Sequence, residues 1–328
     1  MRNKILRSVG GGLIAFLVSI LILEGAIRVF RLIPDDAPIP YRSMPGDERY
    51  APVPNESARS LYGISYRTDS HGLRGPERSL ARISQRARVA VLGDSVVFGL
   101  GIPEDQTIPA WLERLAQRQS LAVEAWNLGV PANNTYHEKA RFARLAPLLR
   151  PDVTIIVMLY NDLEAGTGRY RVTSARTLSN AARHAPYPDA WRPALERSAL
   201  FQAMIRLYTA STGREGEDIG LANFRGVLDQ LDQILGTANA IGSALIVTAM
   251  PGPWPDAARY SEFARGLDQY CAQRKLIFVD LSAVLGRPAR SEYFLPADSV
   301  HPSEEGASLI AEALLPPLTE ALNGSRLY

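Results

Sequence analysis

Short apolar runs alternate with helical stripes from position 89 to the end of the chain. Val89–Leu92 is an apolar run that ends at a glycine, as a buried parallel strand does. The stretch after it carries apolar residues three and four positions apart, which is the spacing of one helix face. The same alternation continues, and later apolar runs predict four more strands: Val123–Trp126, Val153–Leu159, Ala244–Ala249 and Leu276–Val279. Strands separated by helices predict an α/β fold with a parallel sheet covered on both faces.

The first 33 residues predict a membrane anchor. Arg2, Lys4 and Arg7 precede an uncharged, mostly apolar run over 8–23, and Glu24 interrupts this run before it continues for three residues. Basic residues on the amino side predict that this end stays in the cytoplasm and that the rest is exported. A cleaved signal peptide has a similar pattern, and a buried soluble helix is a third alternative. We expect a retained signal anchor over 1–33 and a periplasmic or extracellular body.

The sequence after the predicted anchor indicates the boundaries of a linker, a sheet domain and an insertion within that domain. Six of the 23 prolines fall within 34–54, so we expect a Pro-rich linker and N-terminal extension over 34–86. The predicted sheet domain spans 87–325. Within it, 163–215 is a long insertion, rich in arginine and aromatic residues at its start, that follows the third strand. A long loop at that place is typical of a lid or of a surface that selects the substrate, and a solvated, partly disordered insertion is an equal alternative.

Composition excludes several classes of protein. The chain is 46% hydrophobic and 21% charged, with a net charge of +2, so it can bury a full core and lacks the strongly basic surface of a nucleic-acid binder. Its one cysteine excludes an internal disulfide and a cysteine-ligated zinc site. A glycine-rich phosphate loop does not follow the first strand, so we expect neither a cofactor nor a metal ion.

Polar residues with catalytic potential stand at the carboxyl ends of the predicted strands. In open parallel sheets, chemistry gathers at this edge. Each segment alone is ordinary turn or capping chemistry, and an isolated Asp-x-x-His is more often a surface pair. The segments are Gly93-Asp94-Ser95, Gly129, Asn161-Asp162 and Asp298-Ser299-Val300-His301. Their occurrence at one edge, in four separate parts of the chain, predicts a single site.

Together these segments resemble the SGNH (GDSL-type) hydrolase superfamily. Gly93-Asp94-Ser95 matches its first block, and residues 298–302, Asp-Ser-Val-His-Pro, match its last block completely. Asn161-Asp162 matches the third block but lacks the glycine found there in many members. The resemblance covers about residues 87–323 and implies a flavodoxin-like three-layer α/β/α sandwich with a five-stranded parallel sheet. Gly72-Leu73-Arg74 also resembles a segment of some bacterial members, so Arg74 is expected to brace the site.

The resemblance and the chemistry of these positions imply a Ser-His-Asp triad. Ser95 is the expected nucleophile, His301 the base that takes its proton, and Asp298 the carboxylate that orients the imidazole. The expected oxyanion donors are the backbone N–H groups of Ser95 and Gly129 and the side-chain amide of Asn161. The supporting residues are Gly93, Asp94 and Asp162.

Three functions are compatible with this set. The leading one is an extracytoplasmic serine esterase that removes acyl groups from carbohydrate or lipid substrates through an acyl-enzyme. The second is an O-acyltransferase that uses the same triad to modify a surface polysaccharide, with a separate membrane protein as a possible acyl donor. The third is a non-catalytic binding module, which is disfavoured because every catalytic position is filled.

Overall fold

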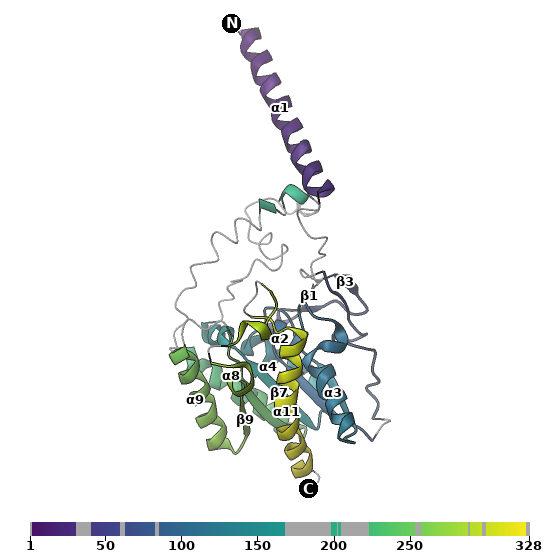
Figure 1. The fold of residues 1–328 in the computed structure, drawn as a ribbon, viewed down its shortest axis with the longest axis vertical. Coiled ribbons are helices and arrows are strands. Elements are labelled where there is room, and N and C mark those ends of the chain that lie inside the picture. Colours follow the sequence, from purple (N-terminus) through teal and green to yellow (C-terminus); the bar gives the residue numbers. More distant parts are fainter. Residues whose placement is uncertain are drawn as a thin grey trace. The chain divides into compact units, whose positions relative to one another are not determined.

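The computed structural model divides the chain into two compact units (Figure 1). The anchor unit comprises 1–38 and 172–217, and the sheet unit comprises 39–171 and 218–328. The residues that the structure describes are 2–30, 41–59, 63–82, 85–167, 198–201, 203–204, 223–252, 257–287, 289–296 and 300–325.

The sheet unit is built on the five-stranded parallel sheet that the sequence predicts. Its strands are β5 (Ala87–Leu92), β6 (Val123–Asn127), β7 (Val153–Met158), β8 (Ala244–Ala249) and β9 (Ile277–Asp280). They lie in the order β6-β5-β7-β8-β9, and every neighbouring pair is parallel. Each strand lies within one residue of its predicted range, except at the start of β5. The predicted fold class is therefore confirmed.

The strand order places the reversal of the chain between β5 and β7. The chain runs from β5 to β6 at the edge and then crosses back to β7 on the other side of β5. In doubly wound sheets, a crevice forms outside the carboxyl ends of the two strands where the order reverses. The segments after β5 and β7 therefore flank the place where this type of fold binds ligands.

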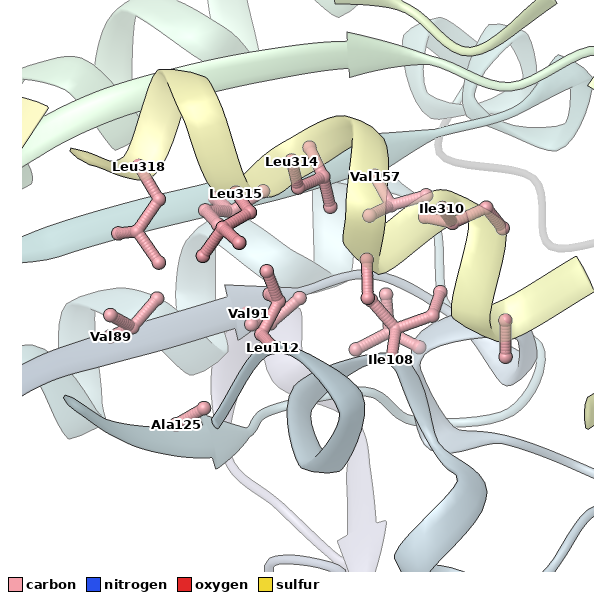
Figure 2. Close-up of a cluster of buried hydrophobic side chains, with 14 of the residues drawn as sticks. Val89, Val91, Ile108, Leu112, Ala125, Val157, Ile310, Leu314, Leu315 and Leu318 are labelled. Carbon is pink, nitrogen blue, oxygen red and sulfur yellow. The ribbon is translucent and has the colours of Figure 1, made fainter. Parts of the chain in front are cut away.

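Helices pack on both faces of the sheet, because neighbouring side chains of a strand point to opposite faces. On β5, Val89 and Val91 join one buried cluster, and Ala90 and Leu92 join the other. The first cluster contains side chains of α3 (Ile108–Arg118), α10 (Ser282–Leu285) and α11 (Glu304–Ser325) (Figure 2). The second contains side chains of α4 (Thr135–Leu149), α8 (Phe224–Ala240) and α9 (Ala257–Arg274). The result is the three-layer sandwich.

Part of the predicted linker belongs to the sheet unit, which begins at residue 39. It contains two antiparallel hairpins, formed by β1 (Tyr41–Ser43) with β2 (Tyr50–Pro52) and by β3 (Ser57–Arg59) with β4 (Ser65–Arg67). The short helix η1 (Gly46–Glu48) carries Glu48, which pairs with Arg141 and Arg144 of α4 at 3.2 and 2.6 Å. Ion pairs of the buried Glu48 carboxylate therefore hold this part of the extension against α4.

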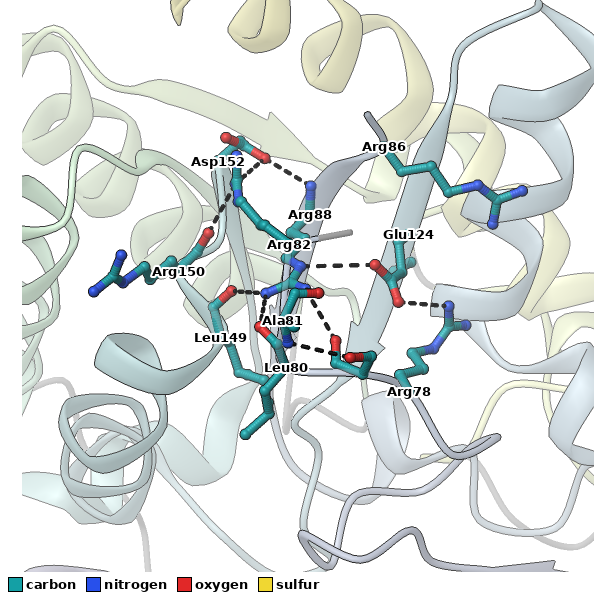
Figure 3. Close-up of polar contacts among 12 residues, drawn as sticks. Arg78, Leu80, Ala81, Arg82, Arg86, Arg88, Glu124, Leu149, Arg150 and Asp152 are labelled. Atoms are coloured by element: carbon teal, nitrogen blue, oxygen red, sulfur yellow. Dashed lines mark hydrogen bonds and ion pairs between the residues drawn. The ribbon is translucent and has the colours of Figure 1, made fainter. Parts of the chain in front are cut away.

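A second set of polar contacts joins this extension to the amino end of the sheet (Figure 3). The buried guanidinium of Arg88, on β5, donates to the carbonyls of Ser79, Leu80, Ala81 and Leu149. Asp152 accepts from the backbone N–H of Arg88 and from Arg82, both at 2.7 Å. These contacts lie at the end of the strands opposite to the candidate site, so they stabilise the fold and leave the carboxyl edge open.

The remaining described elements are short or lie in the anchor unit. The short helices of the sheet unit are α2 (Ser95–Phe98), η2 (Glu104–Gln106), η3 (Tyr160–Thr167) and η6 (Ser291–Tyr293). The anchor unit contains α1 (Arg2–Val29), in which Gly10–Val29 has a mean hydropathy of 2.1 and the length to cross a membrane. Of the predicted insertion 163–215, the structure describes 163–167, 198–201 and 203–204, so its predicted role as a lid lies mostly outside the described residues.

Candidate active site

Ser95 stands at the first position of α2, and the two-residue turn Gly93-Asp94 connects it to the end of β5. Gly93 makes this sharp turn possible, because its φ is 157° and a Cβ there would lie 2.4 Å from Val97 Cγ2. The Asp94 side chain accepts the backbone N–H of Val96 at 2.8 Å and so caps α2. The turn thereby places Ser95 at the carboxyl edge of the sheet, where it is 4% exposed.

His301 lies against Ser95, although 206 residues separate them in the chain. Its Nε2 is 2.8 Å from Ser95 Oγ, and the imidazole is fully buried. The loop that holds it is fixed by backbone bonds, since Leu295 N–H donates to His301 O at 2.8 Å. The predicted partner Asp298 lies outside the described residues. Two members of the predicted triad are therefore within hydrogen-bonding distance.

Asn161, at the start of η3 after β7, reaches the same turn. Its Nδ2 donates to Asp94 Oδ2 at 2.9 Å and to Asn133 O at 3.1 Å. Its Oδ1 is buried and accepts no hydrogen bond from the described residues. Asp162 accepts the N–H and hydroxyl of Thr135 and the N–H of Leu159, at 2.6–2.7 Å, and so fastens the end of β7 to the start of α4. The side chain of Asn161 is thus held by contacts to the loops that follow β5 and β6.

Gly129 packs directly on the turn that carries Ser95. A Cβ at this position would lie 2.2 Å from Phe98 N and 2.9 Å from Asp94 O, so only glycine fits. Its N–H donates to Asn127 Oδ1 at 3.0 Å, which means that the predicted oxyanion donor has an internal acceptor. Ala132, in the same loop, has a left-handed backbone with φ of 66°, and its N–H has no acceptor among the described residues. Strained backbone of this kind is typical of functional sites.

The geometry agrees with a comparison of the sequence with protein families. The model of the GDSL-like Lipase/Acylhydrolase family matches residues 91–309, about two thirds of the chain. The chain belongs to this family. It is therefore an ester hydrolase of the GDSL type, and the match begins in β5, two residues before the Gly93-Asp94-Ser95 turn.

Solved structures of the GDSL type and of esterases are similar to this chain. The lipase/acylhydrolase from Enterococcus faecalis is 17% identical, with a TM-score of 0.45, over 71% of this chain and 95% of that one. The esterase EstA from Pseudoalteromonas sp. is 14% identical, with a TM-score of 0.44, over 72% and 98%. A catalytic mutant of Axe2, an acetylxylan esterase from Geobacillus stearothermophilus, is 18% identical, with a TM-score of 0.43, over 72% and 95%. No curated protein sequence matches this one.

The side chain of Arg74 supports α2 at the end opposite to Ser95. Its buried guanidinium donates to the carbonyls of Phe98, Gly99 and Ile102, at and just beyond the carboxyl end of α2. Asn127 adds a bond from Nδ2 to Val97 O at 2.8 Å. Burial lowers the pKa of Arg74 to about 10, so the guanidinium remains charged at neutral pH. The resemblance of residues 72–74 indicated Arg74, whereas no local signal indicated Asn127 as a brace.

Three carboxyl groups are buried behind the turn: Asp94, Asp162 and Glu138. Burial, together with the charges of Asp162 and Asp94, raises the pKa of Glu138 well above its usual range. Burial raises the pKa of Asp162 to about 7, against the effect of its hydrogen bonds. Glu138 Oε2 has no hydrogen-bond partner among the described residues, which agrees with a neutral acid. Sequence reasoning missed Glu138, because its position on α4 carries no motif.

A cluster of three or more His, Cys, Asp or Glu side chains able to hold a metal ion is absent from the described residues.

Proposed function

We propose that this chain is a membrane-anchored serine esterase that works outside the cytoplasm and removes acyl groups from O-acylated carbohydrate or lipid. The 2.8 Å approach of His301 Nε2 to Ser95 Oγ is the observation that carries the proposal. A serine hydroxyl is a weak nucleophile at neutral pH, and an adjacent imidazole activates it by taking the proton. The burial of both side chains supports this pairing, because bulk water competes little for either group.

The reaction has two half-reactions. Ser95 Oγ attacks the acyl carbon of the ester while His301 Nε2 takes the hydroxyl proton, and the same proton then passes to the leaving alcohol. Water attacks the resulting acyl-enzyme with His301 again as the base, the bond between the acyl carbon and Ser95 Oγ breaks, and His301 returns the proton to Ser95 as the acid is released. Asp298, three residues before His301, is the proposed acceptor for the other ring nitrogen, which would fix the tautomer.

Fixed donors stabilise the oxyanion that forms in each half-reaction. The backbone N–H of Ser95 has no acceptor among the described residues, so it is available at the start of α2. Asn161 contributes its amide if the longer bond of Nδ2, the 3.1 Å bond to Asn133 O, is exchanged for the oxyanion. Gly129 N–H is bonded to Asn127 Oδ1 at 3.0 Å, so it serves as the third donor only when it exchanges this acceptor for the oxyanion.

The proposed location rests on α1 and its flanking charge. The apolar side chains of Phe16, Leu21 and Ile22 are more than 60% exposed in the structure, as lipid-facing residues of a membrane span are. The basic residues Arg2, Lys4 and Arg7 stand on the amino side, which favours a cytoplasmic amino terminus and an exported sheet unit.

The substitution Ser95→Ala tests the nucleophile in the full chain. With p-nitrophenyl acetate we expect hydrolysis at least about a thousandfold slower, and loss of labelling by a fluorophosphonate probe. The melting temperature should stay within a few degrees, because the side chain loses a single hydroxyl. Hydrolysis at the original rate would refute the assignment.

Added oligosaccharide acceptors separate hydrolysis from transfer. The esterase releases acetate whether or not the acceptor is present. Formation of acetylated oligosaccharide at the expense of acetate would instead identify an acyltransferase, since a sugar hydroxyl would then replace water in the second half-reaction.

A further inference from the structure

The carboxylate of Glu24 lies within the apolar stretch of α1 and is bonded to a distant part of the chain. It is the one acidic residue of Gly10–Val29. Arg28, one turn later, pairs with it at 2.6 Å. The other three donors come from the start of one helical segment: Ser198 Oγ at 2.9 Å, Ala199 N–H at 2.9 Å and Leu200 N–H at 2.8 Å. Glu24 therefore joins α1 to residues 198–200.

These bonds satisfy the open end of a helix. Residues 199–201, 203 and 204 are helical, and Phe201 N–H donates to Ser198 Oγ at 3.2 Å. The first N–H groups of a helix have no partner within the helix itself. Ser198 and Glu24 together supply these partners, so the segment is fixed to α1 by its first turn.

The cover on α1 lies mainly at the turn around Glu24 and at Ile20 one turn earlier. Residues 24–26 and Ile20 are half-buried and Ile27 is buried. In contrast, Leu21 and Ile22 are 69% and 64% exposed. The segment that Glu24 binds thus contacts α1 next to a stretch, 21–23, that is apolar and exposed.

The position of Glu24 sets the depth of this contact. It precedes Val29, the end of the apolar stretch, by five residues, or about 7–8 Å along the helix. The 20 residues of the stretch span about 30 Å, the thickness of the hydrocarbon core, which places Val29 at the outer edge of that core. Glu24 therefore lies just inside this edge, where a carboxylate needs partners. Residues that bind it must lie at the same depth.

We propose that residues 198–201, 203 and 204 belong to a second membrane contact, which docks on α1 at Glu24 and lies at the outer edge of the hydrocarbon core of a phospholipid bilayer. This inference rests on the membrane anchor of the proposed function. Met204 is 59% exposed and follows Leu200 by one helical turn, so an apolar edge is available to the acyl chains. A short amphipathic helix binds an interface in this way, with its apolar face about 5–10 Å below the headgroups.

Site-directed fluorescence on the full chain in phosphatidylcholine–phosphatidylglycerol vesicles tests the proposal. The native Cys271 is buried and its pKa is raised to about 12, so a thiol-reactive environment-sensitive dye labels an introduced cysteine selectively. We expect Met204→Cys to give a label that is quenched by lipids with a nitroxide high on the acyl chain and protected from iodide. Leu148→Cys, on α4 and 48% exposed, is the matched control and should show the reverse.

Two further variants examine the role of Glu24. Glu24→Leu removes every acceptor and should make the label at 204 accessible to iodide, whereas Arg28→Gln keeps the acceptors and should leave it protected. A label at Ile22→Cys reports the anchor separately. If that label is quenched by lipid while the label at 204 is accessible to iodide, the second contact is refuted and the anchor holds. Protection from iodide without quenching by lipid also refutes it, because the side chain is then covered by protein. If the label at Ile22 is not quenched, the anchor itself fails.

Discussion

At the scale of single residues, Arg74 supports the short helix that carries the proposed nucleophile, Ser95. Its guanidinium bonds to three carbonyls at and just beyond the end of α2, and Ser95 stands at the beginning of the same four-residue helix. A helix of one turn has little internal support, so its orientation depends on these contacts. Arg74 also has no ion pair with a carboxylate in the described part of the chain. Its positive charge is therefore stabilised by the dipoles of the three carbonyl groups that it binds.

Arg74→Ala should therefore lower kcat about 10- to 100-fold with little change in KM, because the lost charged hydrogen bonds displace Ser95 rather than the substrate. The side chain lines a cavity of about 30 Å³, and its removal enlarges that space. Guanidinium ion at millimolar concentration should restore part of kcat, whereas sodium should not. Arg78→Ala is the control, since Arg78 lines the same cavity but pairs with Glu113. A fall in melting temperature without a fall in kcat would contradict a positioning role.

The buried carboxyl group of Glu138 makes the stability of the fold depend on pH. Its pKa is raised in the fold, so the native state binds more protons than the unfolded state between the usual value of 4.5 and the folded value. Its contribution to stability is complete below about pH 4.5 and is lost as the pH rises through the folded pKa. The raised pKa of Asp162, about 7, acts in the same direction.

Glu138→Gln removes the contribution of Glu138 to this pH dependence. We expect the melting temperature of the native chain to fall between pH 6 and 9, and that of the variant to fall less, as measured by circular dichroism. Glu320→Gln, exposed on α11, should leave the slope unchanged. Parallel melting curves for the native chain and Glu138→Gln would show that Glu138 is ionised throughout.

At the scale of elements, the packing of the loop after β6 against α2 depends on the absence of one side chain. Gly129→Ala would place a methyl group 2.2 Å from Phe98 N, and the backbone of α2 cannot give way without moving Ser95. We expect a loss of about 1–3 kcal/mol or more in the free energy of unfolding, together with a loss of esterase activity.

The control for Gly129→Ala lies on α8. A Cβ at Gly236 meets nothing within 4 Å, and the residue is exposed inside a helix. Gly236→Ala should therefore stabilise the chain by about 0.5–1 kcal/mol, because alanine has the higher helix propensity. Urea unfolding of both variants measures the two effects, and equal shifts would show that the close approach at Gly129 is relaxed in solution.

At the scale of the whole molecule, the proposed membrane anchor and the candidate active site belong to different compact units. The sheet unit contains Ser95, His301 and Asn161, and the anchor unit contains α1. We expect the mature chain to keep residues 1–33 and to stay in the membrane fraction after an alkaline carbonate wash. The intact mass measures the first expectation. A mature chain that begins after Glu24 would instead show a cleaved signal peptide.

The local pattern predicted the elements that depend on local periodicity. The alternation of β5, in which Val89 and Val91 face one layer and Ala90 and Leu92 the other, is a property of the backbone and leaves a pattern in the sequence. The hairpins β1–β4 could not be predicted in the same way. Their strands have three residues each within a Pro-rich stretch, and the Glu48 pairs with Arg141 and Arg144 that hold them in place involve residues far apart in the chain.

The sequence by itself determined the order of strands and helices, the family, and the residue types that stand at the carboxyl edge of the sheet. Tertiary structure alone decided which of these residues meet. It brought His301 to Ser95, engaged Gly129 N–H with Asn127, and buried Glu138 beside two other acids. The physical reason is that strand and helix periodicity is written in neighbouring residues, whereas hydrogen-bond partners and burial depend on groups that the crossovers bring together from distant segments.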